Sequence, residues 1–138
     1  MKLQPDKSDT TIITGYGAGW VSVGFFVDGQ PQQEKVTHSI VIGSHGERLD
    51  WHGIALAQLT PEHFEQLAQM SPELVIFGSG SRLRFVSPAL QRALIDRRIG
   101  VETMDTPAAC RTYNVLASEG RAVAAALLIE SHPTEGFD

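Results

Sequence analysis

The chain has 138 residues, of which 42% are hydrophobic and 20% are charged, and its formal net charge is −5. A chain of this length can bury about two thirds of its extended surface, which favours one soluble globular domain. The acidic balance argues against nucleic-acid binding, because the neutralisation of phosphates requires a basic surface. Cys110 is the only cysteine, so the chain can form neither an internal disulfide nor a multi-cysteine metal site.

The two ends of the chain are polar and carry no hydrophobic pattern. We therefore expect residues 1–10 and 131–138 to be flexible and residues 11–130 to form a single domain. The first six residues, MKLQPD, are too polar for a signal or transit peptide, which predicts a cytoplasmic location. No run of about 18 apolar residues is present, so we expect no membrane-spanning helix.

The first half of the chain has the pattern of β-strands. Residues 20–27 (WVSVGFFV) and 35–42 (KVTHSIVI) are rich in β-branched and aromatic side chains, and the turn signal Asp28–Gly29 lies between them. We expect these two segments to pair as antiparallel strands. A short strand is predicted at residues 48–51, after the turn that follows the second segment.

The second half contains three predicted helices, because a residue that favours the N-cap precedes a proline at three places: Thr60–Pro61, Ser87–Pro88 and Thr106–Pro107. The first helix is expected to run to about residue 70 and the third to about residue 118. In the second helix, Leu90, Leu94 and Ile95 form an apolar stripe, and Gly100 is expected to end the helix.

Short apolar strands are predicted around these helices, at residues 74–77, 101–104 and 121–129. By propensity the last segment fits a helix or a strand, since alanine favours helix. Its nearly continuous apolar character, directly after the helix stop at Gly120, favours a strand in the buried middle of a sheet. The predicted fold class is therefore α/β: a single three-layer domain with a central mixed β-sheet, in which N-terminal antiparallel strands precede a βαβαβ half with right-handed crossovers.

The loop Gly78-Ser79-Gly80 follows an apolar strand, as many nucleotide-binding loops do. The dinucleotide fingerprint fails because Leu83 stands where its third glycine belongs, and a phosphate loop fails because no lysine follows Lys35. Two readings stay open. The loop is either a tight turn or an anion-binding concavity of backbone N–H groups near Arg82 or Arg84.

The third helix carries the other candidate site residues. Cys110 lies near the helix start, where the helix dipole can lower the pKa of a thiol, but a small buried residue is the favoured interpretation. Cys110 and Asn114 form a polar edge beside the face of Tyr113, and this edge is a candidate wall of a cleft.

The histidines and the aromatic residues of the first half have alternative interpretations. His38, His45 and His52 recur every seven residues, but an odd spacing within a strand places side chains on opposite faces, so no metal site is predicted. The aromatic residues of the segment 16–20 (YGAGW) and Trp51 are expected in the core, with a recognition surface as the alternative.

Two segments resemble a widespread family of domains of unknown function: PELVIFGSGSRLRF at residues 72–85 and GVETMDTPAACRTYNVLASEGRAVAAALLI at residues 100–129. Its eukaryotic members include the mitochondrial complex I (NADH dehydrogenase) assembly factor 3 and an adipogenesis-associated cytoplasmic protein. The family loop is usually Gly-Thr-Gly, so Ser79 departs from it while keeping a hydroxyl. The mitochondrial targeting segment is missing, which favours a bacterial cytoplasmic member. The resemblance implies a three-layer α/β domain around a mixed sheet, no established catalytic activity, and action through protein partners.

The leading hypothesis is a non-enzymatic binding or assembly module whose partners are subunits of a membrane or redox complex. The alternative is a binder of a small anionic ligand, or an enzyme, in which the loop amides and Arg111 hold a phosphate or carboxylate. Neither hypothesis includes a cofactor, a metal, a nucleic acid or a membrane span. Both place the cleft at the loop and the start of the third helix, with these candidate residues: Gly78, Ser79, Gly80, Arg82, Thr106, Cys110, Arg111 and Asn114.

Overall fold

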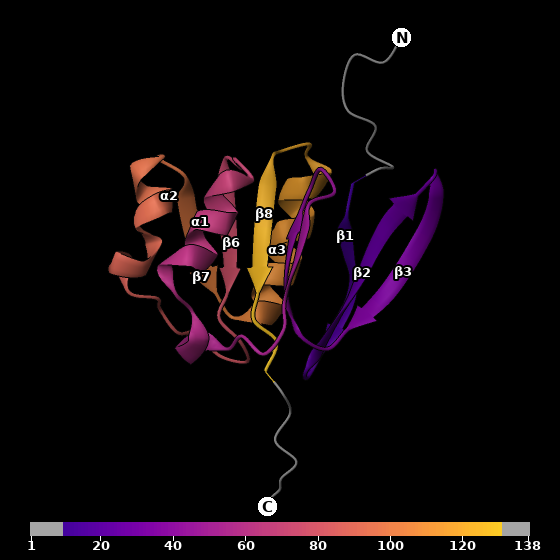
Figure 1. The fold of residues 1–138 in the computed structure, drawn as a ribbon. Helices are drawn as coiled ribbons and strands as arrows, with labels where there is room; N and C mark the ends of the chain where they lie inside the picture. Colours follow the sequence, from indigo (N-terminus) through magenta and orange to yellow (C-terminus); the bar gives the residue numbers. More distant parts are fainter. Residues whose placement is uncertain (1–9, 131–138) are drawn as a thin grey trace, which may run out of the picture.

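The computed structural model describes residues 10–130 (Figure 1). The expectation of flexible ends falls on residues 1–9 and 131–138, which lie outside this range. In chain order the elements are β1 (Ile12–Gly17), β2 (Trp20–Val27), β3 (Gln30–Val36), β4 (Ser39–Gly43), β5 (Arg48–Trp51), the 3-10 helix η2 (Leu56–Gln58), α1 (Pro61–Gln69), β6 (Leu74–Gly78), the 3-10 helix η3 (Pro88–Gln91), α2 (Arg92–Asp96), β7 (Gly100–Met104), α3 (Thr106–Ser118) and β8 (Val123–Leu127). No helix in the described part of the chain has the length and apolar character that crossing a bilayer requires.

The strands form two sheets. β1, β2 and β3 make an antiparallel three-stranded sheet, and the second sheet has five strands in the order β5-β4-β8-β6-β7. β6 runs parallel to β7 and β8, whereas β4 runs antiparallel to β5 and β8. The predicted mixed sheet and the βαβαβ half are thereby confirmed, and the segment with ambiguous propensity is the central strand β8. A separate three-stranded sheet was not predicted.

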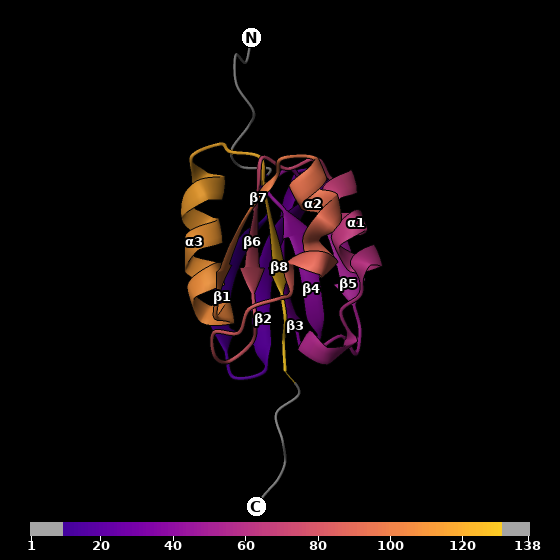
Figure 2. The ribbon, with the colours of Figure 1, turned by 90° about the vertical axis from the view of Figure 1, so that its left-hand side faces the viewer.

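The domain has three layers, with the five-stranded sheet in the middle. α1 and α2 cover one face, and α3 together with the three-stranded sheet covers the other (Figure 2). Side chains alternate between the two cores along each central strand, because successive residues of a strand point to opposite faces. On β4, for example, Ile40 and Ile42 face the three-stranded sheet, whereas Val41 faces the helices α1 and α2.

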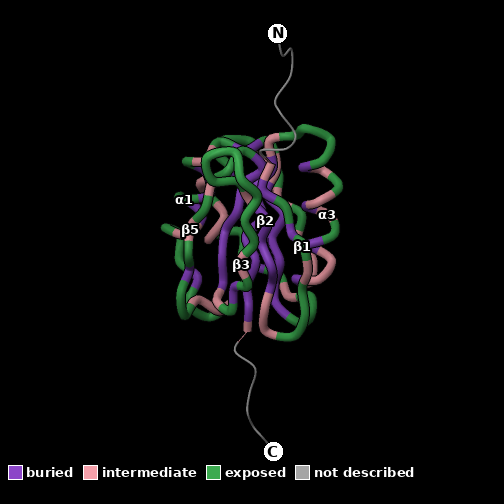
Figure 3. Tube along the Cα trace, turned by 90° about the vertical axis from the view of Figure 1, so that its right-hand side faces the viewer, coloured by how far each residue is buried: buried purple, intermediate pink, exposed green. Residues whose placement is uncertain are grey.

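In the three-stranded sheet, residues 21–24 of β2 are buried, whereas most of β3 is exposed (Figure 3). β2 and β3 are joined by the two-residue loop Asp28–Gly29, in which both residues have positive φ, 51° and 78°. This combination is the type I′ turn that matches the twist of a hairpin. The turn signal was therefore predicted correctly.

The expectation of one strand over residues 35–42 was wrong. The chain leaves β3 at Val36, enters β4 at Ser39, and changes sheet in between: β3 pairs with β2, and β4 pairs with β5 and β8. Val36, Ile40 and Ile42 all face the same core. The apolar pattern therefore continues across the break with unchanged parity, and neither glycine nor proline marks it.

The second predicted helix is shorter and more irregular than expected. It begins as the 3-10 helix η3, continues as α2, and ends before Arg98, which adopts a positive φ of 58°. Gly100 is the first residue of β7 and does not end the helix. Within the predicted stripe Leu94 is fully buried, but Ile95 is 52% exposed, because so short a helix presents only a narrow face to the core.

Candidate functional site

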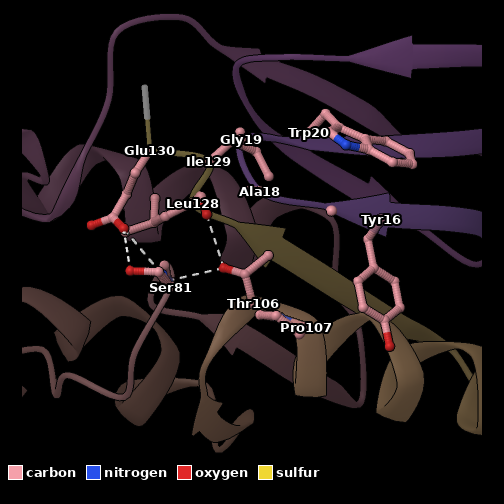
Figure 4. A pocket seen from close by; sticks show the side chains of 12 residues that line it. Tyr16, Ala18, Gly19, Trp20, Ser81, Thr106, Pro107, Leu128, Ile129 and Glu130 are labelled. Atoms are coloured by element: carbon pink, nitrogen blue, oxygen red, sulfur yellow. Dashed lines mark hydrogen bonds between the residues drawn. The ribbon is translucent and has the colours of Figure 1, made fainter. Parts of the chain in front are cut away.

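A cavity of about 560 Å³ lies at the carboxyl ends of β6 and β8. Four segments line it: the β1–β2 turn (residues 16–20), the loop after β6 (80–81), the start of α3 (106–107) and the end of β8 with the residues that follow (128–130) (Figure 4). Pockets for small ligands typically enclose about 300–1,000 Å³, and those of α/β proteins lie beyond the carboxyl ends of strands. This cavity is called the pocket below.

Aromatic side chains of the β1–β2 turn form one wall of the pocket. Tyr16 is 37% exposed and Trp20 is partly exposed, so the expectation of core positions was wrong for both, whereas Trp51 is buried beneath α1. The Trp20 ring lies against Gly17, where an added Cβ would stand 2.5 Å from the indole Nε1. Gly15 and Gly17 of β1 therefore give the ring room to lie across that strand, and Trp20 lines the pocket.

The loop after β6 is held by hydrogen bonds from inside the protein. The N–H of Ser79 donates to the carbonyl of Met104 (2.8 Å), and its hydroxyl donates to the carbonyl of Arg82 (2.8 Å). The same hydroxyl accepts from the N–H of Arg84 (2.9 Å). Ser79 is fully buried within the loop and does not line the pocket. Its hydroxyl, the group shared with the threonine usual in the family, closes the loop on itself.

The Thr106 hydroxyl joins the three inner walls of the pocket. It accepts from the N–H of Gly80 (2.9 Å) and donates to the carbonyl of Leu128 (2.8 Å). The predicted N-cap role of Thr106 was wrong, because the carboxylate of Asp105 caps α3 by accepting from the N–H of Ala108 (2.8 Å). The cap lies one residue earlier, and the threonine is free to tie the loop to β8.

The chain supplies its own anion to the loop. The carboxylate of Glu130 accepts from the N–H of Ser81 (3.1 Å), from the Ser81 hydroxyl (2.8 Å), and from the Arg84 guanidinium. Desolvation opposes ionisation of Glu130, but these hydrogen bonds outweigh it and lower the pKa of the carboxyl. The anion-binding interpretation of the loop required free backbone N–H groups. Within the described residues, the N–H groups of Ser79, Gly80 and Ser81 all donate hydrogen bonds to other parts of the chain.

The two glycines of the loop serve different purposes. Gly80 has a φ of +113°, a conformation that side chains rarely adopt. Gly78 lies within β6, where an added Cβ would stand 2.9 Å from the Thr106 hydroxyl and 3.1 Å from Ala109. Gly80 shapes the turn, and Gly78 lets α3 approach the sheet.

The structure places Cys110 and Asn114 away from the pocket. Cys110 is fully buried in the core under α3, and burial raises the pKa of its thiol to about 12, so it is not a thiolate at neutral pH. The Asn114 amide accepts from the N–H of Ile13 and donates to the carbonyl of Ile13, both at 2.8 Å. Asn114 thus binds the outer edge of β1 as a neighbouring strand would.

The arginines named from the sequence lie at the surface. The Arg111 guanidinium donates to the Tyr16 hydroxyl (2.7 Å) at the outer side of the pocket wall, and this hydrogen bond raises the pKa of Arg111. The Arg82 side chain is exposed, and only its backbone carbonyl takes part in closing the loop. Of the eight candidate residues, Gly80 and Thr106 line the pocket.

Sequence reasoning missed Glu130 and the turn at residues 16–20 as parts of the site. Glu130 carried a signal, since it is the first charged residue after a strand predicted at the centre of the sheet. The YGAGW segment was noted but was assigned to the core. Neither segment carries a local sequence signal that indicates which other part of the fold it will contact.

Two large apolar side chains are exposed on the chain that leaves the pocket. Leu83 is 49% exposed and Phe85 is 74% exposed, and they flank Arg84, whose side chain is tied to Glu130. Because the neighbouring Ser79 hydroxyl anchors the Arg84 backbone, this loop holds both apolar groups at the surface.

The expectation that the histidines are scattered singly was wrong for His38 and His52. Their ring centroids lie 3.9 Å apart, and His45 lies in the β4–β5 turn. The parity rule applies within one strand, but these residues flank a hairpin whose register pairs Ser39 with Trp51. One further step along that register places His38 opposite His52, on the same face.

Comparison with known proteins places this fold among relatives. The sequence profile of the family described as "Protein of unknown function (DUF498/DUF598)" matches residues 13–128. The NADH dehydrogenase [ubiquinone] 1 alpha subcomplex assembly factor 3 of Homo sapiens is 31% identical over 134 residues, which cover 91% of this chain and 65% of that protein. The Bos taurus protein of the same name is 38% identical over 82 residues, 58% of this chain and 45% of that protein. The chain thus spans about half to two thirds of the length of these relatives.

Solved bacterial structures share the whole fold. A Bordetella parapertussis protein superposes with a TM-score of 0.75 at 34% identity, covering 88% of this chain and 97% of that chain. A Mth938-like domain from Bordetella pertussis gives 0.74 at 28% identity, covering 97% of this chain and 96% of that chain. Because the family profile spans nearly all of the described residues, the chain belongs to the DUF498/DUF598 family of proteins of unknown function.

Proposed function

We propose that this chain is a non-enzymatic binding module that assists the assembly of a protein complex. The observation that carries the proposal is the pocket, which has aromatic and aliphatic walls, together with the exposed Leu83 and Phe85 on the loop that continues from it. Aromatic anchors beside an apolar hollow are typical of sites that receive a side chain of a protein partner.

The relatives support the same class of function. Proteins named as assembly factors of NADH dehydrogenase are similar to this chain over most of its length. By analogy, we expect the partner to be a subunit of a membrane or redox complex, although a shared fold does not fix a function. The cytoplasmic location stays a prediction.

The second candidate, a binder of a small anion, is favoured by one observation. The loop after β6 already holds a carboxylate, that of Glu130, through Ser81 and Arg84. A free phosphate or carboxylate would have to displace Glu130 before it reached these groups. This competition makes the anion binder the weaker of the two candidates.

The test compares two matched substitutions in affinity capture from the source cell, read by mass spectrometry. Ala18→Trp fills the pocket from an exposed position on the β1–β2 turn, and Ala89→Trp places the same side chain on η3, against the opposite face of the sheet. Neither substitution removes a hydrogen-bonding side chain. Circular dichroism and thermal unfolding should first establish that both variants fold.

We expect wild type and Ala89→Trp to retain the same protein partner and Ala18→Trp to lose it. Retention of that partner by all three proteins would remove the pocket from its proposed role. If no protein is retained and a small anion co-purifies with wild type alone, the anion binder replaces the assembly module. Turnover of a metabolite that Ala18→Trp abolishes would contradict the non-enzymatic proposal.

A further inference from the structure

A cluster of metal-binding side chains lies away from the pocket, at the β5 edge of the five-stranded sheet. The possible ligand atoms of His38, Asp50 and His52 all lie within 4.8 Å of one another. Asp50 and His52 are two residues apart along the chain, so their side chains point to the same face of the sheet. His38 precedes β4, the other strand of the hairpin, and the register places it opposite His52. The backbone register of β4 and β5 therefore brings the three groups together.

The charges around the cluster favour a cation. Glu34 and Asp50 contribute two negative charges, and Arg48, which binds both, contributes one positive charge. Arg48 and His38 both hydrogen-bond to the Asp50 carboxylate and hold it in place within the cluster. The two carboxylates outnumber the one guanidinium, so the sum of these three charges is negative.

We infer that His38, Asp50 and His52 form a binding site for a divalent transition-metal ion of the zinc type. Two imidazoles and one carboxylate are a donor set that suits such ions, and three protein ligands leave further positions for water. The ion would join the β3–β4 connection to the end of β5, which is where the two sheets meet.

Coordination requires the side chains to turn, because the rings of His38 and His52 stack with their centroids 3.9 Å apart. Bonds of about 2.0–2.2 Å in a tetrahedral site put ligand atoms about 3.3 Å apart. Here His38 Nε2 and Asp50 Oδ1 are 2.7 Å apart, as a hydrogen-bonded pair, and no pair in the cluster exceeds 4.8 Å. Asp50 and His52 are exposed, so rotation of their side chains can provide the remaining shift.

Arg48 would act on the ion through Asp50. Its guanidinium contacts both carboxylate oxygens of Asp50 and both of Glu34. It can keep Oδ2 of Asp50 while Oδ1 turns to the ion, which fixes the orientation of the ligand. Hydrogen-bond partners of this kind commonly orient metal ligands.

The test is a titration of the full chain, purified without a polyhistidine tag, with Co²⁺ followed by absorption and with Zn²⁺ in competition with a chromophoric chelator. Loss of an outer hydrogen-bond partner of a metal ligand typically weakens binding about 10- to 100-fold, so loss of a ligand should weaken it at least about tenfold. We expect one bound ion in wild type and this weakening in His38→Ala and His52→Ala. His45→Ala removes an imidazole from the turn of the same hairpin and should bind as wild type does.

The outcomes are distinct. Absence of saturable binding in wild type, or equal affinity in wild type and His52→Ala, would overturn the inference. His52 is exposed, so its substitution should preserve the fold even if His38→Ala does not. As a second readout, Zn²⁺ should raise the unfolding temperature of wild type and His45→Ala but not that of His52→Ala, because binding to the native state alone stabilises it.

Discussion

The two faces of the five-stranded sheet are covered in different ways. On one face, α1 and α2 form a continuous layer, in which Phe64 of α1 packs near Phe77 of β6 with ring centroids 6.0 Å apart. On the other face, the cover is divided between α3 and a second sheet, which meet along β1. The pocket opens where this divided cover reaches the end of the central sheet. The sheet face that is covered by two different elements leaves room for a pocket, whereas the face that is covered by a continuous layer of helices contributes to the hydrophobic core.

The largest effect is expected on the continuous face. Phe64→Ala removes a fully buried ring and should lower the free energy of unfolding by about 3–5 kcal/mol. Urea unfolding measures this, with the exposed neighbour Glu65→Ala as the control. Folded Phe64→Ala should still hold the partner of the pocket. If Phe64→Ala failed to bind the partner at a temperature where it is folded, the proposal that the two faces of the sheet have separate roles would be contradicted.

On the divided face, Asn114→Ala should be the most damaging polar change. It leaves the N–H and the carbonyl of Ile13 without their side-chain partner, at a cost of about 1–3 kcal/mol. Amide hydrogen exchange should accelerate at Ile13 while β6 stays protected. Val115→Ala, on the neighbouring exposed position, is the control. Uniform acceleration through both sheets would show that β1 does not open by itself.

Acid should release the loop next to the pocket. The folded state lowers the pKa of Glu130, so the stabilisation is complete above the unfolded-state value of about 4.3 and is lost as the pH falls through the folded-state pKa. The contribution at neutral pH should be about 1 kcal/mol or less, because the Glu130 and Arg84 side chains are 34% and 33% exposed. Glu130→Gln should remove this part of the acid sensitivity. The prediction would be contradicted if the free energy of unfolding depended on pH in the same way in wild type and in Glu130→Gln.

The smallest effect is expected at Arg111. Its side chain is at the surface and contacts the Tyr16 hydroxyl, so Arg111→Ala should leave the unfolding transition unchanged within error. The informative measurement is partner affinity. A weaker complex with unchanged stability would place Arg111 in the recognition surface, and unchanged affinity would limit that surface to the pocket itself.

The α/β half was predictable because its signals are local. Proline at the first or second helical position marks the start of α1, η3 and α3, and continuous apolar runs mark β6 and β8. The division of residues 35–42 between two sheets was not predictable, since Val36 and Ile40 face one core with unbroken parity. Pairing partners, unlike element types, depend on the whole fold.

Two of the segments that line the pocket were named from the sequence, whereas the other lining residues were not. The loop at Gly80 and the helix start at Thr106 were identified correctly as neighbours, because strand ends and helix starts meet at one edge of an α/β sheet. The occupant of the loop, Glu130, arrives from another strand. The meeting of His38 and His52 depends on hairpin register, which a spacing rule for single strands cannot capture.

The Thr106 hydroxyl has a consequence for how this family can diversify. By linking the N–H of Gly80 to the carbonyl of Leu128, it makes three walls of the pocket interdependent, so that a change in any of them disturbs the others. The fourth wall, the turn around Ala18, has no such link to that hydroxyl and contains small exposed residues. New specificities would therefore arise most readily by substitution in this turn, on a scaffold that keeps the other three walls constant.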